Sequence, residues 1–275
     1  MLRAAVRQPP PAHRRCRGQR QGRRRAVAAR AGSDGRGPAA AGDPFGMAAV
    51  YESFAQRAIE LQRAKGGRVL VGLAGSPGSG KSTSAAGVAG HVNAELGAGA
   101  AVVLPMDGFH LYRAELDAMP DPREAHRRRG AHWTFDGEAF VRKVREVRAD
   151  DGIVMAPGFD HGTGDPVEGA IAVGEGAEIV IVEGNYILLD EPPWSALKEL
   201  FDEAWFVDCD VDTAMARVVK RHLSVGRSLE QATLRVDTND RPNALEILAT
   251  KERADIFVPS CGGPNTLPPP TFLDE

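Results

Sequence analysis

The chain has 275 residues, of which 43% are hydrophobic, and a formal net charge of −3 at pH 7. This length and composition fit one α/β domain with a sizeable core. No apolar run approaches the roughly 20 residues of a membrane helix, which argues against a membrane protein.

Charge is divided unevenly along the chain. Residues 1–46 contain 11 arginines and two acids, and the remainder contains 23 basic and 35 acidic residues, a net charge of −12. An acidic folded part disfavours a nucleic-acid partner. Cys16, Cys209 and Cys261 lack metal-ligand spacing, which indicates a reducing compartment and no disulfide framework.

Residues 1–46 are rich in Arg, Ala, Gly and Pro and have no acid before Asp34. Such a segment cannot build a core, so we expect disorder. It is either a basic arm for nucleic acid or membrane or an organelle transit peptide. We favour the transit peptide because the basic character ends where the fold begins. Val27-Ala28-Ala29 resembles a plastid processing site, which favours a plastid over a mitochondrion. Without a transit function, the protein would be cytoplasmic.

The first expected elements surround a glycine-rich motif. Apolar residues at helical spacing begin near Ala48 and predict a helix, and residues 69–73 predict a buried parallel strand. The pattern Gly-x-x-x-x-Gly-Lys-Ser follows at residues 75–82, and a helix is expected from Lys81. A strand, this loop and a helix in that order are the context that a P-loop requires.

The P-loop motif predicts a nucleoside triphosphate site. Its glycines allow backbone N–H groups to surround phosphate oxygens, and the helix N-terminus adds partial positive charge. Lys81 can reach the outer phosphates, and the Ser82 hydroxyl can ligate Mg²⁺. The alternative is a glycine-rich turn with a solvated lysine. The residues expected to bind the nucleotide are Gly75, Ser76, Pro77, Gly78, Ser79, Gly80, Lys81, Ser82 and Thr83.

Two further strands are expected to end in acidic residues. The apolar run 101–105 predicts a strand that delivers Asp107, and the run 178–182 predicts one that delivers Glu183. Glu183 would hold Mg²⁺ together with Ser82, and Asp107 would act as a general base that orients a substrate hydroxyl. The alternatives are a strand-end acid that caps a turn for Glu183 and an Asp-Gly surface turn for Asp107.

The remaining pattern alternates helices and strands. An amphipathic helix is expected around 140–147, a loop over 156–170 because of its prolines and glycines, and a short strand at 171–173. The Pro-rich residues 262–275 should form a loose tail. The other expected elements are a strand at 203–207, a helix around 215–222, a helical run from Ser228, a last helix from Asn239 and an edge strand at 256–258.

Strands that alternate with helices predict an α/β fold with a doubly wound, mostly parallel sheet and helices on both faces. The P-loop, Asp107 and Glu183 should then meet at the C-terminal edge of the sheet. Arg217 and Arg221 share a helix face and, with Arg227, would close over the phosphates as a helical lid. A solvated helical face is the alternative for these arginines.

The polar loops supply candidates for contacts with the phosphate acceptor. His110 and His161 lie beside candidate acids and could hydrogen-bond a polyol or a ribose, whereas their spacing disfavours metal ligation. Phe135 and Trp133 would form a wall of the pocket or, equally, pack in the core. The residues expected to contact the acceptor are His110, Phe135, Asp136, Asp160 and His161.

The order of these motifs resembles the phosphoribulokinase/uridine kinase/pantothenate kinase family over residues 69–258. The matching elements are, in chain order, G-S-P-G-S-G-K-S, M-D-G-F-H, F-D, P-G-F-D-H, V-E-G-N-Y and F-V-D-C-D-V-D with R-x-x-x-R. The chain looks most like the uridine kinase-like branch. The resemblance implies that Asp107 is the catalytic base, that Glu183 helps to hold Mg²⁺, and that Arg217 and Arg221 contact phosphates.

The segments that would contact the acceptor resemble different members of this family. Residues 107–109 resemble the pantothenate kinases, whereas residues 135–136 and 157–161 resemble the uridine kinases. The resemblance therefore implies no particular acceptor. Asn239 and Asn243 lie where the family often builds its adenine pocket.

We therefore expect residues 47–261 to form a P-loop kinase domain. It would use ATP and Mg²⁺ to phosphorylate a hydroxyl of a small metabolite, such as a nucleoside, a sugar or a pantothenate-like compound. One alternative is a true uridine/cytidine kinase, and another is an NTPase or switch that transfers no phosphate. The chain has no Asn-Lys-x-Asp element, which disfavours a GTPase. The expected partner is a small-molecule substrate. The sequence predicts no oligomeric state, and a homodimer is one alternative.

Overall fold

The computed structural model describes residues 46–149 and 152–260. The transit-like segment, apart from its last residue, and the Pro-rich tail lie outside these ranges, as do Cys16 and Cys261, so the expectations for them stay predictions. Within the described residues, no helix is both long and apolar enough to span a membrane.

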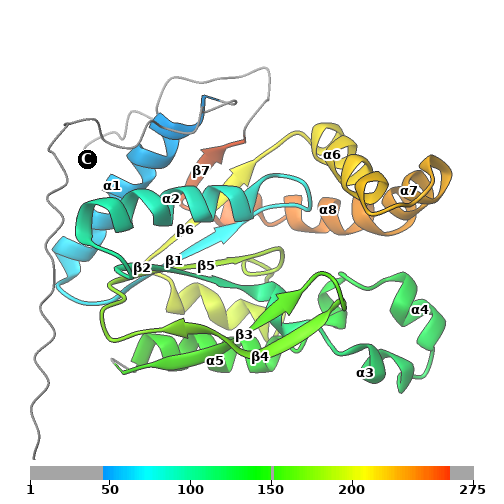
Figure 1. Cartoon of the computed structure of the whole chain (residues 1–275), viewed down its shortest axis with the longest axis horizontal. Helices are drawn as coiled ribbons and strands as arrows, with labels where there is room; N and C mark the ends of the chain where they lie inside the picture. Colours follow the sequence, from blue (N-terminus) through cyan, green and yellow to red (C-terminus); the bar gives the residue numbers. More distant parts are fainter. Residues whose placement is uncertain (1–45, 150–151, 261–275) are drawn as a thin grey trace, which may run out of the picture. The chain divides into compact units, whose positions relative to one another are not determined.

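Five parallel strands form the central sheet, in the order β2-β5-β1-β6-β7 (Figure 1). Every residue of β1 and β5 is buried, because continuous aliphatic runs suit strands that are covered on both faces. The predicted doubly wound α/β fold is confirmed. The strands are β1 (Val69–Ala74), β2 (Ala101–Pro105), β5 (Ile179–Gly184), β6 (Glu203–Asp208) and β7 (Ile256–Pro259).

Helices cover both faces of this sheet (Figure 1). Helices α1 and α2 pack on one face, in a cluster that includes Val69 and Val71 of β1. Helix α5 and the 3₁₀ segment η3 pack on the other face, in a cluster that includes Leu70. Alternate residues of one strand thus supply two separate cores. The bounds are α1 (Ala48–Lys65), α2 (Lys81–Leu96), α5 (Gly137–Ala149) and η3 (Trp194–Leu200).

Short helical elements lie between β2 and α5, where the sequence is polar. The segment η1 continues directly from β2 and contains Asp107. The backbone N–H of Arg113 donates a hydrogen bond to Asp165 Oδ1 over 3.0 Å, which ties this region to a later part of the chain. The elements are η1 (Met106–Phe109), α3 (Arg113–Asp117), α4 (Pro122–Arg127) and η2 (His132–Thr134).

Residues 156–170 were expected to form a loop, and this expectation is wrong. They are most of an antiparallel hairpin that consists of β3 (Val154–Asp160) and β4 (Asp165–Val173). The strand register shifts at Pro157, and such an irregularity accommodates a residue that has no N–H to donate. The strand expected at 171–173 is the end of β4.

Three α-helices follow β6; the first, α6, carries Arg217 and Arg221, and Arg227 lies in the turn after it. Gly226 has a φ of +87° in the turn after α6, a backbone conformation that favours glycine. A π-helical segment, η4, joins α7 to α8, so the last α-helix begins at Arg241 rather than at Asn239. The bounds are α6 (Val211–Ser224), α7 (Leu229–Arg235), η4 (Val236–Asp240) and α8 (Arg241–Leu248), and a 3₁₀ turn, η5 (Lys251–Arg253), precedes β7.

Candidate active site

The register of the sheet brings the P-loop, Asp107 and Glu183 to one edge. Glu183 in β5 pairs with Leu73 of β1 on one side and with Pro105 of β2 on the other. Gly75 and Asp107 each lie two residues beyond those partners. Because parallel strands end at the same edge, the three expected site elements lie together there.

The loop between β1 and α2 has the backbone conformation that a phosphate cradle requires. Gly78 and Gly80 have φ angles of +80° and +98°, a region that disfavours side chains. A Cβ atom at Gly78 would lie 2.3 Å from the carbonyl oxygen of Ala214 in α6, so a side chain does not fit there. Helix α2, 16 residues long, then begins at Lys81, and its free N–H groups and dipole favour an anion at the loop.

A cavity of about 250 Å³ lies at this loop. Ser76 and Ser79 are buried within the loop, whereas Arg217 and Arg221 of α6 line the cavity and Arg227 does not. The structure thus brings the expected nucleotide site together with two of the three expected lid arginines. The cavity is lined by Gly78, Gly80, Lys81, Ser82, Thr83, Arg217, Val218 and Arg221, and not by Gly75 or Pro77.

Ser82 and Glu183 provide oxygen atoms that suit Mg²⁺. Ser82 Oγ donates a hydrogen bond to Glu183 Oε1 over 3.0 Å. Glu183 is 5% exposed, and its Oε2 is buried with no hydrogen-bond partner in the described part of the chain. Mg²⁺ prefers oxygen ligands and fills its other positions with water and substrate phosphates. The described residues include no group of three or more His, Cys, Asp or Glu that could hold a metal.

The charges at this edge influence one another. Burial raises the pKa of the Glu183 carboxyl; the Lys81 ammonium opposes this shift, and the Asp107 carboxylate adds to it. The side chains of Lys81, Asp107 and Glu183 are therefore within electrostatic reach of one another. A divalent cation bound here would offset the repulsion between the two carboxylates.

Arg217 is bonded to the P-loop backbone. Its Nη1 donates to the carbonyl oxygen of Gly78 over 3.2 Å and to Ser260 Oγ over 2.9 Å. Ser260 Oγ in turn donates to the carbonyl oxygen of Ser79 over 2.8 Å. Arg221 lies one helical turn later and is exposed. Arg217 therefore stabilises the loop, and Arg221 is the better placed of the two to move toward a phosphate.

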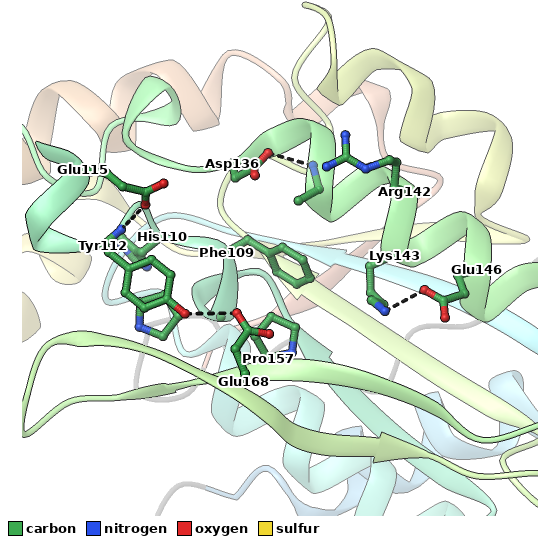
Figure 2. Close-up of a pocket in the computed structure, with 13 residues that line it drawn as sticks. Phe109, His110, Tyr112, Glu115, Asp136, Arg142, Lys143, Glu146, Pro157 and Glu168 are labelled. Carbon is green, nitrogen blue, oxygen red and sulfur yellow. Dashed lines mark hydrogen bonds and ion pairs between the residues drawn. The ribbon is translucent and has the colours of Figure 1, made fainter. Parts of the chain in front are cut away.

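A second cavity, of about 430 Å³, lies between η1, α5 and the hairpin (Figure 2). The expected acceptor residues His110 and Asp136 line it together with Tyr112, whose hydroxyl donates to Glu168 Oε1 over 3.0 Å. Neither Asp107 nor any P-loop residue lines this cavity. It is therefore distinct from the cavity at the P-loop.

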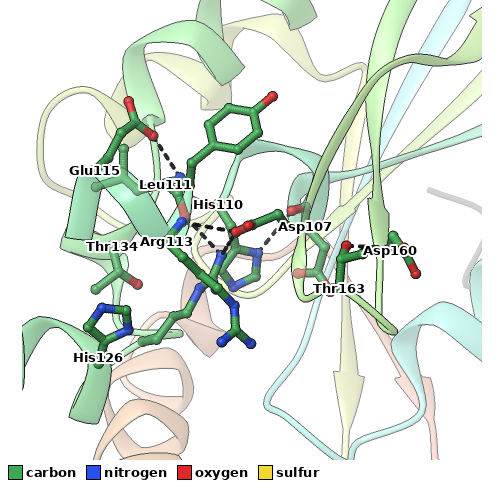
Figure 3. Close-up of polar contacts among 12 residues, drawn as sticks. Asp107, His110, Leu111, Arg113, Glu115, His126, Thr134, Asp160 and Thr163 are labelled. Carbon is green, nitrogen blue, oxygen red and sulfur yellow. Dashed lines mark hydrogen bonds and ion pairs between the residues drawn. The ribbon is translucent and has the colours of Figure 1, made fainter. Parts of the chain in front are cut away.

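His110 follows η1 and lies close to Asp107 (Figure 3). Its Nδ1 is 2.9 Å from the carbonyl oxygen of Asp107, which can only accept, so Nδ1 carries the proton and Nε2 is an acceptor. Burial lowers the pKa of His110, although the Asp107 carboxylate raises it. Burial therefore favours the neutral form of the ring. His161 is exposed at the hairpin turn and also lowers the pKa of His110.

Residues 70–266 match the Phosphoribulokinase / Uridine kinase family. The chain belongs to this family. A relative in Schizosaccharomyces pombe, named "Putative uridine kinase C227.14", is 43% identical over 196 residues, which are 70% of this chain and 83% of that protein. Family membership confirms the resemblance found in the sequence. It makes the protein a P-loop kinase and implies that it binds ATP, with Mg²⁺ typical of such kinases.

Solved structures of related kinases share the fold. A "putative fructose transport system kinase" from Silicibacter sp. TM1040 is 35% identical, with a TM-score of 0.68, and the match covers 75% of this chain and 98% of that one. YFH7 from Saccharomyces cerevisiae, described as "a putative P-loop containing kinase with a circular permutation", has a TM-score of 0.67 at 22% identity, over 76% and 98% of the two chains. The names of these relatives differ, so the family leaves the acceptor open.

The fold adds one residue near His110, Arg129, that the sequence did not assign to the kinase site. Arg129 Nη2 donates to Asp165 Oδ1 over 3.1 Å, and its guanidinium lies 5.9 Å from the centroid of the Phe159 ring. Arg129 also lowers the pKa of His110, as expected of a nearby positive charge. The arginine cluster that includes Arg129 was visible in the sequence, but its partners come from the hairpin, which was not predicted.

Two of the expected acceptor residues have packing and capping contacts. Phe135 is 6% exposed and lies in the core, with its ring centroid 5.8 Å from that of Tyr186. Trp133, by contrast, is 40% exposed. Asp136 Oδ1 accepts a hydrogen bond from the N–H of Ala139 over 2.8 Å, which satisfies one of the free donors at the start of α5.

Asp160 holds the hairpin turn. Its Oδ1 accepts from the N–H of Gly162 over 2.8 Å, and its Oδ2 accepts from Thr163 Oγ1 over 3.1 Å. These hydrogen bonds lower the pKa of Asp160, because they stabilise the charged carboxylate. These contacts account for the Asp-x-Gly-Thr sequence of the turn, and a contact between Asp160 and an acceptor stays a prediction.

The asparagines expected near the adenine have other partners in this structure. Asn239 Nδ2 donates to the carbonyl oxygen of Arg129 over 3.1 Å, and Asn243 Oδ1 accepts from Arg128 Nη2 over 2.9 Å. Both asparagines are buried. They connect η4 and α8 to the segment that follows α4, and their place near the adenine stays a prediction.

Proposed function

We propose that this kinase transfers the γ-phosphoryl group of ATP to a hydroxyl group of a small metabolite. The observation that carries the proposal is the position of Asp107. It lies just beyond the β2–β5 pairing, beside a buried Glu183 whose pKa responds to both Asp107 and Lys81. A carboxylate at the P-loop edge, in addition to the Ser82 and Glu183 pair that would hold the metal, is suited to serve the acceptor.

The P-loop would bind and orient the triphosphate. Backbone N–H groups around Gly78 and Gly80 and the N-terminus of α2 would surround phosphate oxygens, and Lys81 would neutralise charge on the outer phosphates. Ser82 and Glu183 would hold Mg²⁺, which supplies positive charge to the β- and γ-phosphates when it is bound. Arg221 would add charge as the transferring group moves away from ADP.

Asp107 would then act on the acceptor. Its carboxylate would orient the hydroxyl in line with the γ-phosphorus and accept the hydroxyl proton during transfer. A new bond forms between the acceptor oxygen and the γ-phosphorus, the bond from that phosphorus to the bridging oxygen breaks, and ADP leaves with the electron pair. His110 lies close to Asp107, and the charge of Arg129 acts on His110, so both residues are suited to contact the rest of the acceptor.

The acceptor class rests on family membership and on the polar groups near Asp107. A nucleoside, a sugar or a pantothenate-like compound would each offer a hydroxyl. The 43% identity to the protein named "Putative uridine kinase C227.14" makes uridine and cytidine the first compounds to test. An NTPase that transfers no phosphate is the alternative of another class, and the fate of the γ-phosphate separates the two.

A screen with radiolabelled ATP tests the proposal. Nucleosides, pantothenate, sugars and glycerate are offered with Mg²⁺, and labelled products are separated from labelled inorganic phosphate. The proposal requires a labelled organic product with at least one acceptor and none with Lys81→Ala. Release of inorganic phosphate alone, at a rate that no acceptor changes, would favour the NTPase.

We also infer from composition that residues 1–46 direct the protein to an organelle, a plastid in preference to a mitochondrion. The 11 arginines and two acids of this segment support the inference, because transit peptides are basic and poor in acids.

A further inference from the structure

A groove of about 530 Å³ lies where helix α4, helix α7 and segment η4 meet. It shares no lining residue with the cavity at the P-loop or with the cavity beside α5. Of the described residues, those that line the groove include three arginines and no acid. They are Arg127, Arg227, Gln231, Leu234, Arg235 and Thr238.

Arg235 is the most enclosed of these arginines. Its Nη1 donates to the carbonyl oxygen of Arg127, and its Nη2 donates to that of Arg129 over 2.8 Å. Both acceptors are neutral. Its Nε is buried and has no hydrogen-bond partner within the described residues. A half-buried guanidinium that bonds only to neutral acceptors keeps its full charge available to an anion.

Two acids face this cluster and neutralise part of it. Glu124 is an ion-pair partner of Arg127. Asp240 raises the pKa of Arg235, but its Oδ2 is already within 2.9 Å of His222 Nε2. Neither acid lines the groove. The surface that a ligand would meet is therefore positive.

The pKa of Arg235 is consistent with this excess of positive charge. Burial lowers it first, and the neighbouring Arg227, Arg128 and Arg127 lower it further, against the opposing effect of Asp240. Like charges this close repel one another, and a bound anion would relieve the repulsion. Leu234 adds an apolar surface to the same groove and is 63% exposed.

We propose that this groove binds a small organic anion, such as a carboxylate or a phosphate ester, whose apolar body rests on Leu234 and whose charge meets Arg127, Arg227 and Arg235. Arginine suits this role because its planar donors match the oxygens of carboxylates and phosphates. The proposal goes beyond the proposed kinase function, since it concerns binding and requires no transfer.

Arg235 in the groove bonds to the backbone of Arg127 and Arg129, and the charge of Arg129 acts on His110, so residues 127–129 connect the groove with the expected acceptor region. Two kinds of molecule could supply an anion of this chemistry. It can be an acidic group of the phosphate acceptor itself, or a separate effector that holds the lid helix α7 against α4.

Phenyl phosphate is a suitable probe, and benzyl alcohol is its neutral match. Each is titrated by calorimetry into the full-length protein, whose P-loop is first filled with Mg²⁺ and a non-hydrolysable ATP analogue. Phenyl phosphate should bind, benzyl alcohol should not, and added salt should weaken the binding. Arg227→Gln should weaken it by roughly tenfold or more, the effect of losing one charged hydrogen bond.

Arg123→Gln is the matched control. Arg123 is also exposed and lies on α4, but it does not line the groove, so its loss should leave binding unchanged. Arg227→Gln, at an exposed position, is preferred to changes at Arg235 because it should not disturb folding. The proposal is overturned if phenyl phosphate does not bind, if the neutral match binds equally well, or if the two variants behave alike.

Kinetics then separate the two sources of the anion. If phenyl phosphate raises the KM for the acceptor in proportion to its concentration, the groove holds an acidic group of the acceptor. If it changes kcat at an unchanged KM for the acceptor, the groove holds a separate effector. Because binding is measured without turnover, failure to find any acceptor would count against the kinase proposal and not against the groove.

Discussion

Ser82 Oγ lies 3.0 Å from Glu183 Oε1, and this hydrogen bond joins the first turn of α2 to the end of β5. The second carboxylate oxygen of Glu183 is buried and has no partner in the described part of the chain. A buried charge with one hydrogen bond is costly unless a cation meets it. The pair therefore links metal binding to the stability of the site.

The first prediction concerns Glu183→Gln. Burial raises the pKa of Glu183, so its contribution to stability is present below the ordinary glutamate pKa and is lost as pH rises through the raised value. At pH 7, without metal, the variant should therefore melt at a higher temperature than wild type, and the difference should shrink toward pH 5.

Thermal melts with and without Mg²⁺ and a nucleotide check this prediction. The ligands should stabilise wild type more than the variant, and kcat of the variant should fall by about 10²-fold or more. A variant that is less stable than wild type at pH 7 without metal would show that the Glu183 carboxylate is structural.

The second prediction concerns Lys81→Ala. Lys81 lines the P-loop cavity and should neutralise the outer phosphates in both the ground state and the transition state. The variant should therefore bind ATP more weakly and lose turnover, measured by titration of a fluorescent ATP analogue and by phosphate transfer. Near-normal activity would mean that the loop is not a working phosphate cradle.

The third prediction separates Arg217 from Arg221. Arg217→Ala removes the bonds to Gly78 and Ser260, so it should lower the free energy of unfolding by about 1.5–3 kcal/mol and raise the KM for ATP. Arg221→Ala should leave stability unchanged and lower kcat by roughly 10²-fold. Chemical denaturation and steady-state kinetics of both variants measure this contrast, and equal effects on kcat and stability would refute it.

The fourth prediction concerns residues 1–46. A protein that starts at Met47 should fold and keep full activity, and a fusion of residues 1–46 to a fluorescent reporter should reach an organelle. A reporter that stays in the cytosol would contradict the targeting role. Loss of activity on truncation would indicate a functional arm instead.

Much of the fold could be predicted because its signals are local. The strand, glycine loop and Lys81 form one continuous motif, and the aliphatic runs of β1 and β5 are typical of strands covered on both faces. The convergence of Asp107 and Glu183 also followed, since parallel strands end at one edge. The hairpin could not be predicted in this way. Its glycines and Pro157 are typical of a loop, and its strand pairing includes a register shift that no local pattern indicates.

The residues of the candidate acceptor site were harder to predict from the sequence. Asp136 and Asp160 have carboxylates that could contact an acceptor hydroxyl, but the same group caps a helix or closes a turn equally well. Arg227 was grouped with Arg217 and Arg221, yet it lies beyond the end of α6 and lines a different groove. Arg129 needed the unpredicted hairpin to reveal its partners, Asp165 and Phe159.

In the proposed function, Asp107 orients the acceptor hydroxyl and accepts its proton. Asp107→Asn keeps the size of the side chain but cannot accept the proton at neutral pH. Titration of a fluorescent ATP analogue provides the control, because Lys81 and the loop remain and ATP affinity should be almost unchanged. A collapse of ATP binding would instead assign Asp107 to the metal site.

The decisive measurement compares wild type with Asp107→Asn in transfer of ³²P from γ-labelled ATP to the acceptor that the screen identifies. The organic product and inorganic phosphate are quantified separately in the same reaction. We predict that the variant forms labelled product about 10²–10⁴-fold more slowly, the usual contribution of a positioned general base. Transfer within a few-fold of wild type would contradict the account and leave Asp107 as a residue of the turn.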